Sequence, residues 1–523
     1  MIEMQKLYQN RVCISIILFI FSFAILSFNL SEQGPHQDEI DFFYAYSLVY
    51  YDLIKKGDFF HPCWNGSGEC EELSVIGCDR IEHWVTTHGF VKHLLIGIGV
   101  SALEGNNNPD NYSPMPPLCK PSKDPIPGIN VPTKDELSSA RFFSVVLSSL
   151  SIVLAYFIGK ILFNRSVGFI FSLLLLFSSL WFAYSRTIMT EPFIYFFMLL
   201  SFFLLLYSLK QKNKIRYVLL VSSAIIFGIA FDTKAIVFMF FPLFILTIFL
   251  RNSINEKLTK ISFNKKRYFS KSIIISLFYT LIIFIAIIGT LPFYWIGPYE
   301  QIIFQKESLN AYTDTFSLKL PGETDSQFVG FLSTITVTIV PIIDVYYEFF
   351  STEETPESVS RANNFSSVPL SILFLTGVGY LIYSIKTKGI TGSEVLILFW
   401  ATSMYILLSL MVESYSTSRF FIMMFLPVLL VASYGYYRFF TTIQNKKLQI
   451  FSFLSLISAH AITTLIFWDR LFYQPDMIWS DPLMIRSQEA IMSVEVLLLS
   501  LIFSVFFIIL GIKKIKDSKT INF

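Results

Sequence analysis

The chain has 523 residues, of which 54% are hydrophobic and only 15% are charged, and its formal net charge is +2. An ordinary soluble domain contains about 25% charged residues, so this composition excludes a soluble enzyme and a disordered chain. The small net charge also provides no basic surface for nucleic acid. Apolar runs such as residues 12–30 and 496–512 are long enough to cross a bilayer, which takes about 17–25 residues. The composition therefore predicts an all-α polytopic membrane protein.

Twelve apolar runs are the predicted membrane spans. They cover residues 12–30, 142–162, 166–184, 190–209, 217–232, 234–250, 272–292, 368–385, 393–412, 419–438, 448–468 and 491–512. The first run is interpreted as a retained helix, because it has the length of a full span and no small-residue cleavage site ends it. A further apolar run at 330–350 contains Pro341, Asp344 and Glu348. We interpret it as a re-entrant or interfacial segment, and a thirteenth span is the alternative.

The basic residues predict the orientation. Lysine and arginine gather in the connections at 210–216, 251–271, 386–388, 438–447 and 513–519. With twelve spans these connections lie on the same side as both termini, and the positive-inside rule makes that side cytoplasmic. The predicted extracytoplasmic segments are then residues 31–140, 293–367 and 469–490. We expect short helices within residues 31–140. The chain divides into a main membrane domain, 1–468, and a tail, 469–523, with an external loop, the last span and a basic cytoplasmic end.

The first external loop contains four of the five cysteines of the chain: Cys63, Cys70, Cys78 and Cys119. Cysteines in an extracytoplasmic loop favour disulfides. Zinc binding is the alternative, and the lack of a CxxC pair argues against it. The spacing does not assign the disulfide partners.

An acidic pair, Asp38 and Glu39, follows shortly after the first predicted span. Paired carboxylates can act as a general base on a hydroxyl group, orient a partner or hold a divalent cation. The plainer alternative is an acidic first turn of a helix, which the helix dipole favours. The residue types alone favour that alternative.

A second polar stretch contains His83, His88, Lys92 and His93. The three histidines recur every five residues, which is about 140° on a helix at each step, so they share no face on which to hold a metal. A metal site is therefore the less favoured interpretation. Lys92 and His93 could instead contact a phosphate or lie at the membrane surface.

Four cations lie at predicted external ends of spans, where the positive-inside rule does not place them: Arg141, Arg186, Lys234 and Arg419. Glu191 follows Arg186 at the start of the next predicted span. Ionisable groups beside spans are often functional, although snorkelling to the membrane surface explains a single one equally well. As a set beside an acidic loop, they suit a ligand that carries a phosphate.

The acidic pair and the histidine stretch resemble those of the GT-C integral-membrane glycosyltransferases, specifically the group of protein O-mannosyltransferases and lipid A aminoarabinose transferases. In that group the first external loop opens with an acidic pair, here Asp38 and Glu39. The mannosyltransferases follow with His-Pro-Pro-Leu-Gly-Lys-Leu-Leu-Ile, and this chain has a stretch that begins at His88. Both prolines are missing here, and His93 replaces the motif lysine, with Lys92 one position earlier.

The later motifs follow the same order over roughly residues 30–435. In the family an arginine leads the second span, here Arg141, and an arginine with a downstream acid precedes the fourth, here Arg186 and Glu191. A lysine closes a later span, here Lys234, and a cation precedes a late Leu-Pro span, here Arg419. The resemblance implies a GT-C-like bundle of about 12–13 transmembrane helices, with residues 1–468 as its catalytic domain.

The resemblance also implies an activity. Such enzymes transfer a sugar from a polyprenyl-phosphate donor, with inversion and on the extracytoplasmic face, to a protein hydroxyl or to a lipid or glycan. Asp38 would be the general base, and Glu39 would support it or bind a divalent metal, the one cofactor left open. The donor phosphate would be bound by Arg141, Arg186, Lys234 and Arg419. The acceptor, the donor or a metal would be contacted by His88, Lys92, His93 and Glu191.

Two other classes of protein are the alternatives. A transporter or flippase for lipid-linked sugars is the main one. Transporter sites lie near the bilayer midplane in broken helices, whereas the charges of this chain lie at predicted helix ends. A non-catalytic membrane scaffold or sensor is the second.

Overall fold

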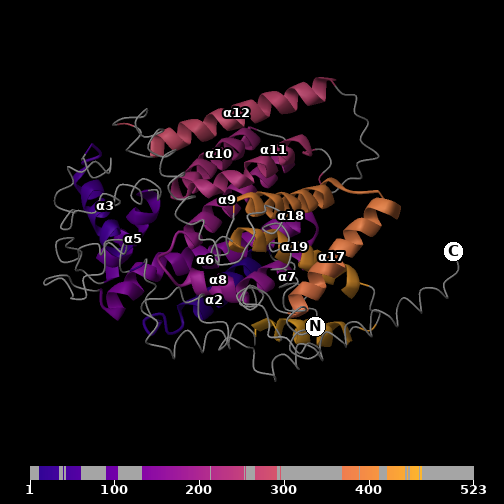
Figure 1. Cartoon of the computed structure of the whole chain (residues 1–523), viewed down its shortest axis with the longest axis horizontal. Coiled ribbons are helices and arrows are strands. Elements are labelled where there is room, and N and C mark those ends of the chain that lie inside the picture. Colours follow the sequence, from indigo (N-terminus) through magenta and orange to yellow (C-terminus); the bar gives the residue numbers. More distant parts are fainter. Residues whose placement is uncertain are drawn as a thin grey trace, which may run out of the picture.

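A computed structural model defines the fold. It describes residues 11–33, 39, 43–60, 90–103, 132–211, 214–251, 254, 266–290, 295, 368–387, 389–411, 421–441, 445, 448–458 and 460–461. Every regular element within these ranges is a helix (Figure 1). The prediction of an all-α protein is therefore confirmed.

Within the described ranges, five helices are long and apolar enough to cross a membrane. They are α6 (Lys134–Leu162), α9 (Glu191–Lys210), α10 (Ile215–Thr233), α12 (Lys266–Thr290) and α17 (Val368–Thr387). Each coincides with one of the predicted spans, so the prediction of a multi-pass membrane protein is confirmed. Two further helices, α18 (Gly392–Met411) and α19 (Phe421–Phe440), coincide with the runs at 393–412 and 419–438.

Two predicted spans are each two elements, which corrects the sequence-based boundaries. The run at 166–184 divides into α7 (Arg165–Leu176) and α8 (Ser179–Ser185), because the backbone of Ser178 is extended between them. The run at 234–250 divides into a 3-10 helix, η4 (Ala235–Phe240), and α11 (Phe241–Phe249). Pro242 lies in the first turn of α11, where a missing N–H costs no helical hydrogen bond.

The first apolar run forms α2 (Arg11–Ser27), which is shorter than the predicted 12–30 and packs against α6. Of the run at 448–468, only residues up to 461 are described. The runs at 330–350 and 491–512 lie outside the described residues. The domain division at 468 therefore stays a prediction.

Helix α6 lies at the centre of the bundle and contacts α2, α5, α7 and α9. A capping box fixes its first turn: the Thr133 hydroxyl accepts from the N–H of Glu136, and the Glu136 carboxylate accepts from the N–H of Thr133 at 2.7 Å. This arrangement satisfies two backbone groups that the helix start would otherwise leave unpaired. The capped start also fixes the position of Arg141 two turns further along.

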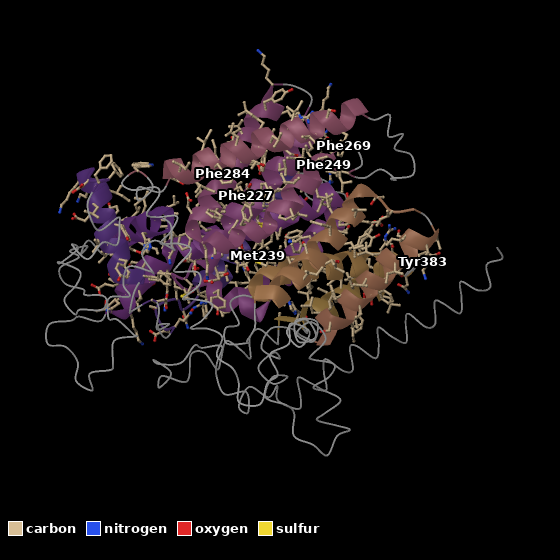
Figure 2. The ribbon with its side chains drawn as sticks, turned by 45° about the horizontal axis from the view of Figure 1, so that its top comes forward. Phe227, Met239, Phe249, Phe269, Phe284 and Tyr383 are labelled. Atoms are coloured by element: carbon tan, nitrogen blue, oxygen red, sulfur yellow. The ribbon has the colours of Figure 1, made fainter. Side chains whose placement is uncertain are left out.

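Aromatic side chains fill the space between the helices on the α12 side. Phe227 of α10 is fully buried and packs edge to face on Phe244 of α11, with ring centroids 4.8 Å apart. Phe284, on the outer side of α12, is exposed (Figure 2). An exposed apolar face is what a lipid-facing helix presents.

The described part of the predicted external loop 31–140 contains two short helices, α3 (Tyr44–Lys56) and α5 (Phe90–Leu103). Short helices were expected there from the sequence. They pack on one another, and α5 also packs on α6 and α10. In Figure 1 both lie at one side of the bundle. Helix α3 ends at Lys56 and is followed by the C-cap Gly57, whose left-handed backbone (φ 71°) lets its N–H reach the carbonyl of Ile54. The described part of the loop is thus docked on the first half of α6.

Candidate functional site

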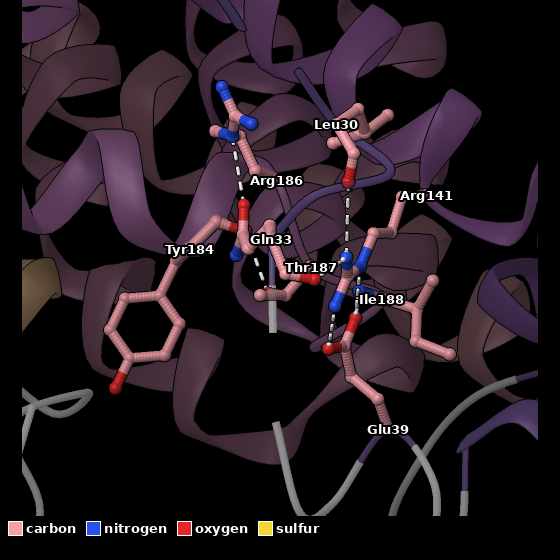
Figure 3. A network of polar contacts seen from close by, with 8 residues as sticks. All are labelled: Leu30, Gln33, Glu39, Arg141, Tyr184, Arg186, Thr187 and Ile188. Carbon is pink, nitrogen blue, oxygen red and sulfur yellow. Dashed lines mark hydrogen bonds and ion pairs between the residues drawn. The ribbon is translucent and has the colours of Figure 1, made fainter. Parts of the chain in front are cut away.

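A buried ion pair joins the first loop to the central helix. The Nε of Arg141 donates to Oε1 of Glu39 at 2.9 Å, and its Nη2 donates to Oε2 at 2.5 Å. Both residues are completely buried. Two parallel bonds between a guanidinium and a carboxylate form a strong and directional pair. The third nitrogen, Nη1, donates to the carbonyl oxygens of Leu30 and Gln33 (Figure 3).

Glu39 also contacts the connection between α8 and α9. The backbone N–H of Ile188 donates to Oε1 of Glu39 at 2.9 Å. One carboxylate therefore joins three segments that are distant in sequence: the chain after α2, the second turn of α6 and the loop at 186–190. Burial of this carboxylate is compensated by three hydrogen bonds from nitrogen donors.

Arg186 lies next to this ion pair and shares a partner with it. Its Nε donates to the side-chain oxygen of Gln33 at 2.8 Å, and its Nη2 donates to the carbonyl of Asn29 at 3.0 Å. Burial, followed by the nearby positive charge of Arg141, lowers the pKa of Arg186. Two guanidinium groups, those of Arg141 and Arg186, thus contact Gln33 beside the carboxylate of Glu39. Guanidinium groups suit an anionic ligand such as a phosphate.

A second ion pair joins the start of α9 to the end of α10. Lys234 Nζ lies 3.3 Å from Oε1 of Glu191, and the Glu191 side chain is buried whereas that of Lys234 is 18% exposed. Thr190 donates to the other oxygen of Glu191 at 3.4 Å. Lys234 is the C-cap residue of α10 and has an extended backbone. The sequence-predicted residues Glu191 and Lys234 are therefore in contact.

Lys92 and His93 lie in the interface between α5 and α3. The Nζ of Lys92 lies over the ring of Phe43, and Nδ1 of His93 lies 2.9 Å from the Ser47 hydroxyl. The ring of Tyr50 packs against His93. Burial, followed by the charge of Lys92, lowers the pKa of His93, so this histidine is neutral at pH 7. In the described part of the chain, no three His, Cys, Asp or Glu side chains come together as metal ligands.

The remaining predicted site residues lie outside the described residues. These are Asp38, His88, Arg419, Cys63, Cys70, Cys78 and Cys119. Their predicted roles stay predictions.

Sequence reasoning missed two parts of the network, Gln33 and the backbone N–H of Ile188. Gln33 is 8% exposed and accepts from Arg186 while its carbonyl accepts from Arg141. A polar residue a few positions after an apolar run was the available signal. A backbone donor has no signal in the sequence, because its role depends only on where the chain passes.

The fold and the buried ion pairs together define a multi-pass, all-helical membrane protein with a charged site where the first loop meets the bundle. Residues 125–304 match the model of the family described as dolichyl-phosphate-mannose-protein mannosyltransferase. That segment includes Arg141, Arg186, Glu191 and Lys234. The resemblance that the motifs predicted is therefore confirmed over these residues.

Three solved structures are similar to the chain at low sequence identity. The crystal structure of the oligosaccharyltransferase of Archaeoglobus fulgidus in complex with zinc and sulfate has a TM-score of 0.47 and 14% identity, over 91% of this chain and 52% of that one. The same archaeal protein, AglB, in complex with an inhibitory peptide and a dolichol-phosphate has a TM-score of 0.45 and 12% identity, over 91% and 56%. ArnT from Cupriavidus metallidurans bound to undecaprenyl phosphate has a TM-score of 0.43 and 10% identity, over 97% and 77%.

The chain spans about half the length of the archaeal oligosaccharyltransferase. A comparison with curated protein sequences gave no match.

Proposed function

We propose that the chain is a membrane glycosyltransferase that uses a polyprenyl-phosphate sugar as donor. It transfers a hexose, mannose-like or related, with inversion, to a hydroxyl group of a protein or of a lipid or glycan. The observation that carries this proposal is the network of Glu39, Arg141 and Arg186 inside a chain whose residues 125–304 match a mannosyltransferase family. Such a network combines a carboxylate-bearing loop with two guanidinium groups, which suits transfer from a lipid phosphate.

Asp38 is the general base in this proposal. A carboxylate can accept the proton of the acceptor hydroxyl as the oxygen attacks the sugar. Asp38 directly precedes Glu39, whose two oxygens are held by Arg141 and by the N–H of Ile188. The ion pair therefore restrains the backbone beside the base. Because three nitrogens of Arg141 already bond protein groups, we assign Arg141 mainly to positioning Glu39.

Arg186 and Lys234, together with Arg419, bind the donor phosphate in this proposal. They stabilise the negative charge that grows on the phosphate as the sugar leaves. The Lys234 side chain is 18% exposed, whereas that of Glu191 is buried. A phosphate can therefore compete with Glu191 for the ammonium group.

No step of the proposal requires a metal. Both oxygens of Glu39 accept from nitrogen donors, and Glu191 is paired with Lys234. These contacts leave the described carboxylates of the site poorly suited as metal ligands.

The active site lies on the extracytoplasmic side in this proposal, and both termini are cytoplasmic. The support comes from α9, which begins at Glu191, beside the site, and ends at Lys210. The basic connection with Lys210, Lys214 and Arg216 is consequently at the opposite end of the helix from the site. The positive-inside rule assigns that basic end to the cytoplasm.

A transfer assay tests the proposal. Full-length protein in liposomes receives a panel of polyprenyl-phosphate sugars and candidate acceptors, and mass spectrometry detects the products. We expect transfer with one donor, and we expect Lys234→Met to lower kcat/KM by about 10²–10³ through loss of phosphate stabilisation. Lys210→Met, at the other end of α9, is the control and should retain activity. Movement of the lipid-linked sugar across the bilayer with no transfer would instead identify a flippase.

A further inference from the structure

Three uncharged polar side chains are buried on the neighbouring helices α8 and α9. Trp181 and Ser185 lie one turn apart on α8, and Tyr195 lies on α9, with the rings of Trp181 and Tyr195 5.3 Å apart at their centroids. Each of the three is at most 3% exposed. The indole N–H and the two hydroxyl groups have no hydrogen-bond partner among the residues that the structure describes. We call these three residues the Trp181 cluster.

Orphaned polar groups of this kind are uncommon in a protein interior. Buried N–H and O–H groups are almost always bonded, because desolvation without a partner is unfavourable. A single one can reflect local packing. Three such groups on two helices that pack against one another indicate a binding site for a polar group.

The Trp181 cluster adjoins the charged site. Ser185 directly precedes Arg186. Tyr195 lies four residues after Glu191, so the side chains of Glu191 and Tyr195 lie on the same face of α9. Tyr195 therefore lies about one helical turn further along α9 than Glu191, which pairs with Lys234. A ligand that reaches both places has a charged part at the helix ends and an uncharged polar part beside α8.

We propose that the Trp181 cluster binds the sugar ring of the lipid-linked donor, an inference that rests on the function proposed above. A sugar hydroxyl can accept from the indole N–H and can both donate to and accept from the hydroxyls of Ser185 and Tyr195. The aromatic rings can pack against the apolar face of the sugar. Because a site that bonds a given hydroxyl discriminates strongly against a ligand that lacks it, the cluster determines which sugar is used.

Conservative substitutions test this inference. Trp181→Phe, Ser185→Ala and Tyr195→Phe each remove the polar atom and keep most of the side-chain volume. The controls are Trp400→Phe, a buried tryptophan packed on Phe202 and Phe240, and Tyr279→Phe, whose hydroxyl bonds to Ser223. Binding of polyprenyl-phosphate mannose, polyprenyl-phosphate glucose and sugar-free polyprenyl phosphate is measured with full-length protein in detergent, together with its thermal midpoint.

We expect each substitution in the cluster to weaken binding of the preferred sugar-bearing donor by about five- to tenfold, the effect of one lost hydrogen bond. Binding of the sugar-free lipid should change less than about twofold, and the controls should leave both affinities unchanged. Equal weakening of both lipids would overturn the inference. So would unchanged binding together with a raised thermal midpoint, which would identify the three groups as unsatisfied core residues. A wild-type protein that binds no sugar-bearing donor would contradict the proposed function itself.

Discussion

Arg141 and Glu39 carry opposite charges in the protein interior, and the stability of the folded protein depends on both charges being present or both being absent. Removing either partner leaves an uncompensated buried charge, which costs about 3–5 kcal/mol. Replacing both by apolar residues of similar size is often neutral or stabilising. The ion pair can therefore be tested separately for its contributions to stability and to activity.

The first prediction concerns this ion pair. We expect Arg141→Ala and Glu39→Ala each to lower the free energy of unfolding by about 3–5 kcal/mol, and Glu39→Leu combined with Arg141→Met to recover most of it. Thermal unfolding of the purified variants measures this. Transfer activity should stay low in the double variant, because Asp38 would lose its anchored neighbour. A double variant with wild-type activity would show that the ion pair only supports the fold.

The second prediction concerns His93 and pH. Burial lowers the pKa of His93 in the folded protein, so the unfolded chain binds a proton below about pH 6.5 that the folded chain does not. Stability should therefore fall as the pH falls below about 6.5. Thermal midpoints between pH 5 and 8 should decline less at low pH in His93→Asn than in the wild type. Parallel curves for the two proteins would show that folding does not change the pKa of His93.

At the residue scale, the sequence allowed the charged set to be predicted but not its partners. The positions of Arg186 and Lys234 at helix ends follow from the apolar runs, whereas Arg141 lies two turns inside α6, because that helix begins at Lys134 and not at the predicted 142. The pairing of Arg141 with Glu39 depends on where the chain after α2 turns back toward α6. No local pattern contains that information.

Helix crossings depend on glycines at particular positions. A Cβ atom on Gly377 of α17 would collide with the carbonyl oxygen of Val431, and one on Gly435 of α19 would collide with the backbone of Gly377. Small residues allow the two backbones to approach closely, which is a common packing mode of membrane helices. Gly379, two positions further along α17, has nothing within contact distance of an added Cβ.

The third prediction uses these two glycines of α17 as a matched pair. Gly377→Ala should lower the thermal midpoint, because α17 and α19 must separate to admit the methyl group. Gly379→Ala should be neutral or stabilising by about 0.5–1 kcal/mol, since alanine is the better helix former. Thermal unfolding of both variants in the same detergent tests this. Equal midpoints would contradict the close crossing of α17 and α19.

At the element scale, apolar runs predicted which segments are helical but not every interruption. The breaks at Ser178 and before Pro242 divide two runs that are apolar throughout. Hydropathy alone does not reveal such breaks. The proline was the available signal at the second break, and the extended serine at the first depends on tertiary packing. The first break also produces α8, the helix that carries Trp181 and Ser185.

At the scale of the whole molecule, composition was enough to predict a helical membrane protein, because lipid leaves the backbone few alternatives. The arrangement of the helices was not predictable in the same way. Apolar runs of similar composition do not indicate which helices pack against one another. The contacts of α6 with α2, α7 and α9 are therefore known only from the structure. The function depends on that arrangement, because the charged residues of the site come from four separate segments.

If the acidic pair serves sugar transfer from a lipid phosphate, as proposed, loss of its first carboxylate must slow that transfer. Transfer from the preferred polyprenyl-phosphate sugar is compared in wild-type protein, in Asp38→Asn and in the control Asp52→Asn, which alters an aspartate paired with exposed Lys56 on α3. We predict that Asp38→Asn lowers the transfer rate at least about 100-fold, the contribution of a general base. Donor binding and the Asp52→Asn rate should stay near the wild-type values. Transfer at the wild-type rate by Asp38→Asn would show that Asp38 is not the general base.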